Sequence, residues 1–261
     1  SQRPSMPPSG SWKNPDRHPS TLGAVTGRHP ERFALREALT TEWRTGSTLN
    51  QAEVSMDDKI SAVLETYHER LQEEQRVMRG DAPPDADSLD KLLLPVGPQT
   101  GRLMHILASS LKEPNILEIG TSYGYSGIWL ADAARKSGGR VTTLELQDYK
   151  SAYAREMAVK AGLADYIDFK VGDAVTLIQE SAERFDFILL DLWKELYVPC
   201  LEAFYPKLNP GAIVVADNMI FPGGDGVARY GRAVRALPGM TSVLLPVGSG
   251  IEVSRLEAGA S

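Results

Sequence analysis

Residues 115–146 have the sequence NILEIGTSYGYSGIWLADAARKSGGRVTTLEL: an apolar run, a glycine-containing turn, a helical stretch and a second apolar run. The same alternation continues through three further apolar runs at 166–172, 185–191 and 212–217. Strands that alternate with helices long enough to cross a sheet run parallel, and their crossovers are right-handed. We therefore predict an α/β fold, with a doubly wound, mostly parallel sheet covered by helices on both faces.

The regions on either side of this core also show regular patterns. Two more strand candidates, 241–247 and 250–256, lie close enough together to form a C-terminal antiparallel hairpin. Residues 56–79 carry apolar side chains on one helical stripe, which predicts an amphipathic helix, and 99–111 predict another. Residues 31–45 also have apolar groups at helical spacing, which predicts a short docked helix.

We divide the chain into three parts. Residues 1–30 contain six prolines and few large apolar groups, so we predict a mobile, Pro-rich extension. Residues 31–95 form a predicted helical segment, and 96–261 form the predicted α/β domain.

Composition excludes several classes of protein. The 261 residues carry 28 Lys+Arg against 34 Asp+Glu, a formal net charge of −6, which disfavours a main role in wrapping nucleic acid. The single cysteine, Cys200, cannot form an internal disulfide or by itself build a zinc site, and we expect a cytoplasmic location. No apolar run approaches the roughly 20 residues that cross a bilayer, so we expect no membrane association.

Ligands of such sheets bind beyond the carboxyl ends of the strands. The first candidate site is the turn after residues 115–120, where Gly120 and Gly124 would let a ligand approach the backbone. The spacing is not GxGxxG, and Glu118 favours an amine-bearing or cationic ligand over a pyrophosphate. The alternative is a glycine turn that serves packing alone.

Two acids follow the next strands. Glu145 lies 25 residues after Gly120, where it could accept hydrogen bonds from ribose hydroxyls, although a solvated carboxylate is the alternative. Asp173 could accept from an adenine amino group or cap a helix, and the two roles can coexist. With the glycine turn, these residues favour an adenosine-type cofactor.

Oxygen-bearing side chains also end the fourth and fifth strand candidates. Asp191 ends one, with Lys194 three residues on, and Asp217 and Asn218 end the other. Three oxygen ligands from adjacent strand ends, with no His or Cys among them, suit a divalent cation such as Mg²⁺. A lone Asp at a strand end usually caps a helix. Capping does not readily explain acidic and amide side chains at two neighbouring strand ends beside a lysine.

These motifs resemble those of the cation-dependent O-methyltransferase family, which includes catechol and caffeoyl-CoA O-methyltransferases. The resemblance covers roughly residues 94–256, is closest to the catechol branch, and leaves 1–55 without a counterpart. It rests on five motifs in order, ILEIGTSYGYSGIWLA, TTLEL, GDA, FDFILLDLWKELYVP and VVADNMIFPGG.

The resemblance implies a Rossmann-like methyltransferase fold, S-adenosylmethionine as methyl donor and a bound divalent cation. Asp191, Asp217 and Asn218 match the metal ligands, and Lys194 matches the catalytic base. The positions that match the S-adenosylmethionine site are Val96, Glu118, Gly120, Ser126, Glu145, Leu146, Ala174 and Trp193. Asp173 is added because of its position after the third strand candidate. The positions that match the acceptor pocket are Leu92, Lys194, Asn218 and Pro222.

The implied reaction is methylation of a hydroxyl on a small aromatic, catechol-like acceptor. A phenol has a pKa near 10, so a cation that stabilises its oxyanion and a lysine that accepts its proton would both help. One departure concerns the acceptor: catechol enzymes of animals use a late glutamate to contact a substrate hydroxyl, and residues 239–250 contain no acid.

Two other functions stay open at this point. Some bacterial relatives methylate a hydroxylated tRNA uridine, although the acidic composition does not favour a nucleic-acid partner. A non-catalytic nucleotide-binding α/β protein is the other alternative, disfavoured by the absence of GxGxxG. The resemblance also implies a homodimer, with 31–79 as the candidate interface.

Overall fold

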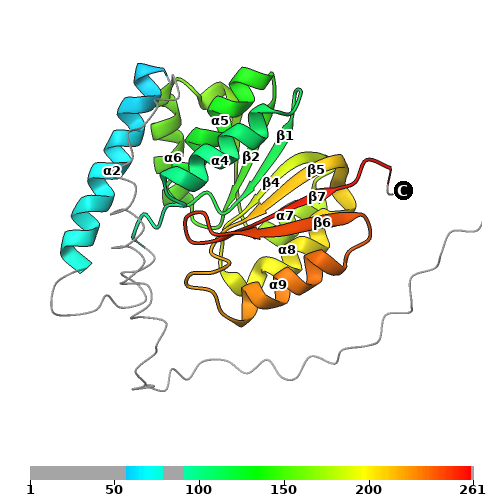
Figure 1. Ribbon diagram of the computed structural model, residues 1–261. Helices are drawn as coiled ribbons and strands as arrows, with labels where there is room; N and C mark the ends of the chain where they lie inside the picture. The colour runs from blue at the N-terminus through cyan, green and yellow to red at the C-terminus, as the bar shows by residue number, and fades with distance from the viewer. Residues whose placement is uncertain (1–56, 79–90, 260–261) are drawn as a thin grey trace, which may run out of the picture.

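The computed structural model of the protein describes residues 57–78 and 91–259 (Figure 1). The predicted extension at 1–30 and the predicted helix at 31–45 lie outside the described residues. No helix in the described ranges is long and apolar enough to cross a membrane.

A seven-stranded sheet with strand order β3-β2-β1-β4-β5-β7-β6 forms the centre of the fold. The five strands from β3 to β5 are parallel, whereas β7 pairs antiparallel with both β5 and β6. The predicted mostly parallel sheet and its C-terminal hairpin are therefore confirmed. The strands are β1 Asn115–Ile119, β2 Arg140–Glu145, β3 Ile167–Val171, β4 Phe185–Leu190, β5 Leu208–Ala216, β6 Met240–Leu245 and β7 Ile251–Leu256.

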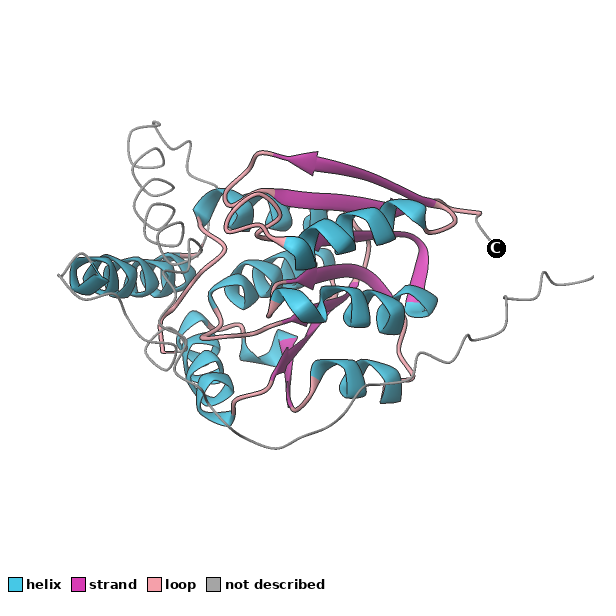
Figure 2. Cartoon of the chain, turned by 90° about the horizontal axis from the view of Figure 1, so that it is seen from below, coloured by secondary structure: helices cyan, strands magenta, loops and turns pink. Residues whose placement is uncertain are grey.

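Helices cover both faces of this sheet, as the strand–helix alternation predicted (Figures 1 and 2). The described α-helices are α2 Asp58–Met78, α4 Pro98–Ser109, α5 Tyr125–Ser137, α6 Asp148–Ala161, α7 Ala174–Glu180, α8 Tyr197–Phe204 and α9 Asp225–Ala236. Helices α4, α5 and α6 lie on one side of the sheet and α7, α8 and α9 on the other (Figure 1).

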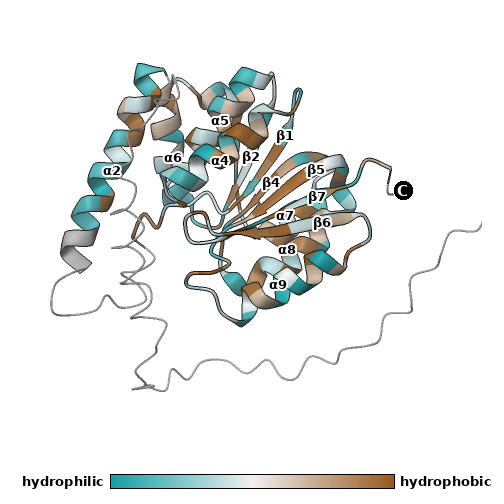
Figure 3. Cartoon of the chain, viewed as in Figure 1, coloured by the Kyte–Doolittle hydropathy of each residue, from teal (hydrophilic) through white to brown (hydrophobic). Residues whose placement is uncertain are grey.

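The two faces carry separate hydrophobic cores, because successive side chains of a strand point to opposite sides. In β1, Ile116 belongs to the core that includes residues of α2, α4, α5 and α6, whereas its neighbour Leu117 belongs to the core that includes residues of α7, α8 and α9. Strands buried on both faces need near-continuous apolar sequence, and the central strands are correspondingly hydrophobic (Figure 3). The apolar stripe of α2, including Ile60, Tyr67 and Leu71, belongs to the first core.

Most boundaries agree with the prediction to within one or two residues, but the start of β5 and the crossover after β4 differ from it more. Strand β5 begins at Leu208 and not at residue 212, because Leu208 pairs with Phe185 before a register shift restores pairing at Ile213. The Pro210-Gly211 pair, which resembles a turn in sequence, is accommodated in this irregularity. The crossover after β4 is not one helix: short 3-10 turns, η2 Lys194–Leu196 and η3 Tyr205–Lys207, flank α8.

Candidate active site

Two neighbouring parallel strands place the predicted ligands at one edge of the sheet. Strand β4 ends at Leu190, which pairs with Ala216, the last residue of β5, so Asp191 and Asp217 follow directly at matching positions. The backbone N–H of Asp191 donates to the carbonyl of Ile119 at 2.9 Å, and that of Asp217 donates to Leu190 at 3.1 Å. The ladder therefore extends one residue past each strand and fixes both backbones.

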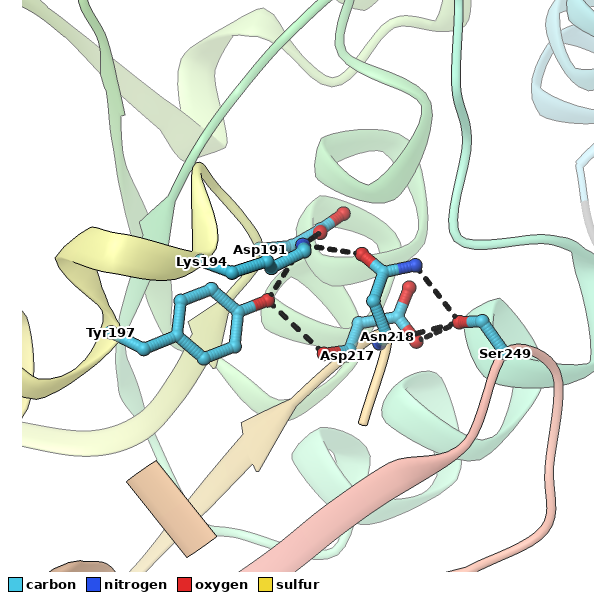
Figure 4. A network of polar contacts seen from close by, with 6 residues as sticks. All are labelled: Asp191, Lys194, Tyr197, Asp217, Asn218 and Ser249. Atoms are coloured by element: carbon cyan, nitrogen blue, oxygen red, sulfur yellow. Dashed lines mark hydrogen bonds and ion pairs between the residues drawn. The ribbon is translucent and has the colours of Figure 1, made fainter. Parts of the chain in front are cut away.

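The amine of Lys194 forms hydrogen bonds to three side chains of the site (Figure 4). Its Nζ donates to Asp191 Oδ1 at 3.2 Å, to Asn218 Oδ1 at 2.5 Å and to the hydroxyl of Tyr197 at 2.9 Å. The predicted base and two predicted metal ligands thus converge on one point, as the strand-end positions indicated.

Ser249, in the loop between β6 and β7, contacts two of the three predicted ligands, Asp217 and Asn218, and was not predicted. Its hydroxyl donates to Asp217 Oδ1 at 2.6 Å and accepts from Asn218 Nδ2 at 3.1 Å (Figure 4). With its amide nitrogen bound to Ser249, Asn218 turns its oxygen toward Lys194. Asn218 also has a φ of 56°, a left-handed conformation that is uncommon outside glycine and often found at functional sites.

Tyr197 is a second residue that sequence reasoning missed. It is fully buried, and its hydroxyl accepts from Lys194 and donates to the backbone carbonyl of Asp217 at 3.1 Å. Burial raises the pKa of Tyr197 well above its usual value, so the group remains a neutral phenol. Its position three residues after Lys194 was the only available signal, and tyrosines at that spacing are commonly packing residues.

The carboxylates of this cluster affect each other. Asp217 is 1% exposed, and burial, followed by the charge of Asp191, raises the pKa of Asp217 to about 8. A buried carboxylate near a second one is costly to ionise unless a cation lies close to both. The cluster is therefore electrostatically suited to positive charge.

The chemistry of the donors fits a hard divalent cation. The predicted set comprises two carboxylates and the amide oxygen of Asn218, and oxygen atoms are the ligands that Mg²⁺ prefers. Two of these oxygens, on Asp191 and Asn218, already point to one positive group, the Lys194 amine. Within residues 57–78 and 91–259, no cluster of three or more His, Cys, Asp or Glu side chains forms a metal site.

The neighbouring loop, between β1 and α5, contains the predicted methyl-donor residues. Gly120 has a φ of +104°, and a Cβ atom there would lie 1.9 Å from the backbone oxygen of Asp191. Packing therefore requires glycine at this position, and the approach of a ligand to the turn stays a prediction. The same close contact places the β1 loop directly against the strand end that carries Asp191.

Glu118 lies in β1, just before this loop, and is fully buried. The Thr143 hydroxyl donates to its Oε2 at 2.5 Å, while Oε1 has no hydrogen-bond partner among the described residues. Burial raises the pKa of Glu118 to about 7, although the Ser126 and Thr143 hydroxyls oppose this change. A buried carboxyl with one oxygen that lacks a well-aligned donor fits a cationic or amine-bearing ligand, which the sequence predicted here.

Glu145 ends β2 and supports the same loop. Its Oε2 accepts from the backbone N–H of Ser122 at 2.7 Å, and its Oε1 accepts from Gln147 at 3.0 Å. Ser122 adopts a positive φ of 46°. Glu145 is therefore half-buried and anchored to the loop, unlike the freely solvated carboxylate that was the alternative.

The remaining predicted residues take part in neither the Lys194 network nor the hydrogen bonds of Glu118 and Glu145 among the described residues. Asp173 caps α7 by accepting from the N–H and hydroxyl of Thr176, both at 2.8 Å, which confirms the capping role and leaves the adenine contact a prediction. Leu146 and Trp193 are large apolar side chains with exposed fractions of 67% and 60%. The others are Leu92, Val96, Ala174 and Pro222, of which Val96 is buried and the rest are half-buried.

Comparison with known families agrees with this geometry. The family model described as O-methyltransferase matches residues 88–255, which is more than half of the chain. This chain belongs to the O-methyltransferase family. The resemblance noted from the motifs is confirmed, since relatives in this family carry the names catechol and caffeoyl-CoA O-methyltransferase.

Curated relatives of this O-methyltransferase family match part of the chain. A catechol O-methyltransferase of Niastella koreensis is 36% identical over 132 residues, which are 49% of this chain and 59% of the relative. One from Mycobacterium tuberculosis is 37% identical over 140 residues, 53% of this chain and 63% of the relative. The chain thus spans about three-fifths of the length of these relatives.

Solved structures confirm the Rossmann-like methyltransferase fold. Cofactor-bound Rv0187 from M. tuberculosis has a TM-score of 0.64 at 25% identity, covering 82% of this chain and 97% of that one. The O-methyltransferase TomG from Streptomyces achromogenes, in complex with SAM, has a TM-score of 0.63 at 24% identity, covering 85% and 97%.

Proposed function

We propose that this protein is a divalent-cation-dependent O-methyltransferase that moves a methyl group from S-adenosylmethionine to a hydroxyl of a small aromatic, catechol-like acceptor. The observation that carries the proposal is the convergence of Asp191, Lys194 and Asn218 on one point, beside the buried carboxylate of Asp217. Membership of the O-methyltransferase family and catechol-named relatives support the same reaction.

Asp191, Asp217 and Asn218 would hold the cation. A cation held there would supply Lewis-acid chemistry that stabilises an acceptor oxyanion, and it would favour acceptors with vicinal hydroxyls. The chain's own contribution is orientation: Ser249 fixes the Asp217 and Asn218 side chains before any ligand binds.

Lys194 would take the proton from the acceptor hydroxyl. Its amine contacts two of the proposed ligands, so a hydroxyl bound there would lie close to Nζ. The neutral phenol of Tyr197 accepts a hydrogen bond from the amine, which restricts the positions that the amine can take beside a bound hydroxyl.

The β1 loop and the surrounding strand ends would bind S-adenosylmethionine, which supplies an electrophilic methyl group on a sulfonium. Glu118 has a buried oxygen free for the amino group, and Glu145 has the strand-end position of a ribose-binding acid. The exposed Leu146 and Trp193 would cover the adenine, with Asp173 and Ala174 beside it. Val96 would contribute a backbone contact.

Leu92 and Pro222 would form the rim of the acceptor pocket. The stretch 239–250, which comprises β6 and the loop after it, contributes the hydroxyl of Ser249 to the site and contains no carboxylate. We propose a small aromatic diol as acceptor because the relatives described above are named catechol O-methyltransferases.

Methyl transfer should be measured with S-adenosylmethionine and Mg²⁺ over catechols, caffeoyl esters, flavonoids and tRNA. We expect turnover on the diols, and loss of that turnover in Asp217→Ala. Asp168→Ala is the matched control, since Asp168 forms an exposed ion pair with Lys170 on β3. Turnover on tRNA alone, or none on any acceptor, would refute the proposed acceptor class.

A further inference from the structure

Helix α2 lies outside residues 88–255, the stretch that the O-methyltransferase family model matches, yet it contacts the proposed cofactor site. Its apolar stripe packs into the core formed with α5 and α6. Three polar side chains on the same helix, Tyr67, Arg70 and Glu74, reach beyond that core. They contact the two backbone segments that border the proposed S-adenosylmethionine site.

Tyr67 contacts the first segment, the loop 120–124. The tyrosine is fully buried, and its hydroxyl donates to the backbone carbonyl of Tyr123 at 2.7 Å. A Cβ on Gly124 would lie 3.2 Å from this hydroxyl, so the loop is packed closely against it. A hydrogen bond from α2 thus holds the loop that follows Glu118 and binds Glu145.

Arg70 and Glu74 contact the second segment, residues 91–96. The Arg70 guanidinium donates to the Lys91 carbonyl at 3.0 Å, and Glu74 Oε2 accepts from the backbone N–H of Leu93 at 2.9 Å. The two side chains also bind each other, with Arg70 Nε 2.7 Å from Glu74 Oε1. The segment that contains Leu92 and Val96 is therefore bound through its backbone by the ion pair of Arg70 and Glu74.

The two segments are also joined to each other through α2. The Arg70 guanidinium carbon lies 3.9 Å from the ring centroid of Tyr123, so one side chain touches both segments. The loop in turn binds Glu145 through the N–H of Ser122. Helix α2, the loop and the end of β2 thus form one connected unit.

We infer that α2 is a positioning element for the methyl donor, in which Tyr67, Arg70 and Glu74 pre-arrange the loop 120–124 and the segment 91–96. This inference rests on the proposed function, because it takes Glu145 and Val96 as contacts to S-adenosylmethionine. Loops that are ordered before binding do not lose that freedom when the ligand arrives, so affinity increases. None of the three side chains is a catalytic residue, since each acts through the backbone of another.

The first test is Tyr67→Phe in the full chain, which removes one hydroxyl and keeps the ring. We expect the Kd for S-adenosylmethionine, measured by titration calorimetry, to rise about three- to tenfold, the size of one lost hydrogen bond. In steady-state assays the KM for S-adenosylmethionine should rise by a similar factor, with kcat at saturating donor unchanged. A purely structural role would lower the fraction of binding-competent protein and leave the Kd unchanged.

Tyr205→Phe is the matched control, because the Tyr205 hydroxyl donates to the Pro238 carbonyl over the same 2.7 Å, away from the site. Its Kd should equal that of the wild type. An unchanged Kd in Tyr67→Phe, with wild-type binding intact, would overturn the inference alone. Absence of S-adenosylmethionine binding in the wild type would instead refute the proposed function.

Glu74→Ala tests the second segment independently. Loss of its bonds to Leu93 and Arg70 should also raise the Kd for S-adenosylmethionine about threefold or more. Glu69→Ala, a change at an exposed position of the same helix, should leave it unchanged. Equal affinities in Glu74→Ala and Glu69→Ala would contradict a positioning role for this pair.

Discussion

The amine of Lys194 binds oxygen atoms from three side chains, two of which were predicted from their strand-end positions. Those two, Asp191 and Asn218, were predictable because parallel strands bring their carboxyl ends to one edge. Tyr197 and Ser249 were not, because their roles depend on how a crossover and a hairpin loop fold back onto that edge. Nothing in the local sequence of Ser249 distinguishes it from an ordinary loop serine.

Replacing Lys194 with alanine should abolish proton acceptance and leave the donor site intact. We expect kcat to fall by about a hundredfold or more, the usual contribution of a general base, with the Kd for S-adenosylmethionine unchanged. Lys160→Ala is the control, since Lys160 forms an exposed ion pair with Glu156. Loss of S-adenosylmethionine binding in calorimetry would show that Lys194 supports the cofactor site.

Glu118 predicts a pH dependence of stability in the unliganded protein. Burial raises the pKa of Glu118 from 4.5 to about 7, so between these values the folded state retains a proton that the unfolded chain has released. This carboxyl therefore lowers the free energy of unfolding as pH rises from about 4.5 to 7, by on the order of 3 kcal/mol.

Glu118→Gln removes this titration. The stability of the variant relative to the wild type should increase with pH across this window, as measured by urea unfolding at several pH values. Glu156→Gln, a change at an exposed ion-paired position, should follow the wild-type profile. Parallel profiles for wild type and Glu118→Gln would disprove the account of this buried acid.

Among the elements, the five parallel strands were predictable because buried parallel strands need short, nearly continuous apolar runs bounded by turns, and the antiparallel β6 and β7 were predictable because their apolar runs lie close together in sequence. The start of β5 was not, since Pro210-Gly211 has the composition of a turn but lies within a strand irregularity. The split crossover at 194–207 was also missed, because apolar spacing alone does not distinguish a 3-10 turn from the first turn of a helix.

The turn after β1 depends on Gly120. Gly120→Ala would place a Cβ 1.9 Å from the Asp191 carbonyl oxygen at a φ of +104°, so both strands must shift. We expect the free energy of unfolding to fall by about 3 kcal/mol or more, measured by urea denaturation.

Gly162→Ala provides the comparison for this turn. Gly162 also has a positive φ, +70°, but no atom lies within 4 Å of the added Cβ. Its cost should be only that of the left-handed conformation, about 1–2 kcal/mol. Equal destabilisation by the two substitutions would mean that the contact with Asp191 is unimportant.

The complete fold joins residues that are distant in sequence, and this explains which functional features escaped prediction. Helix α2 was predicted from its apolar stripe, but its bond to Tyr123 spans 56 positions, and periodicity carries no information about such contacts. The bond between Ser249 and Asp217 spans 32 positions. The candidate ligands at the ends of β4 and β5 could be predicted because the topology of a parallel sheet is enough to bring them together.

A single titration distinguishes the proposed enzyme from any metal-independent alternative. Catechol methylation by the wild-type protein is measured in excess EDTA and then after stepwise addition of Mg²⁺, with Asp217→Ala in parallel. We predict that turnover falls to background in EDTA and returns with Mg²⁺ in the wild type only. Undiminished turnover in EDTA would contradict the assignment of Asp191, Asp217 and Asn218 as the ligands of a required cation.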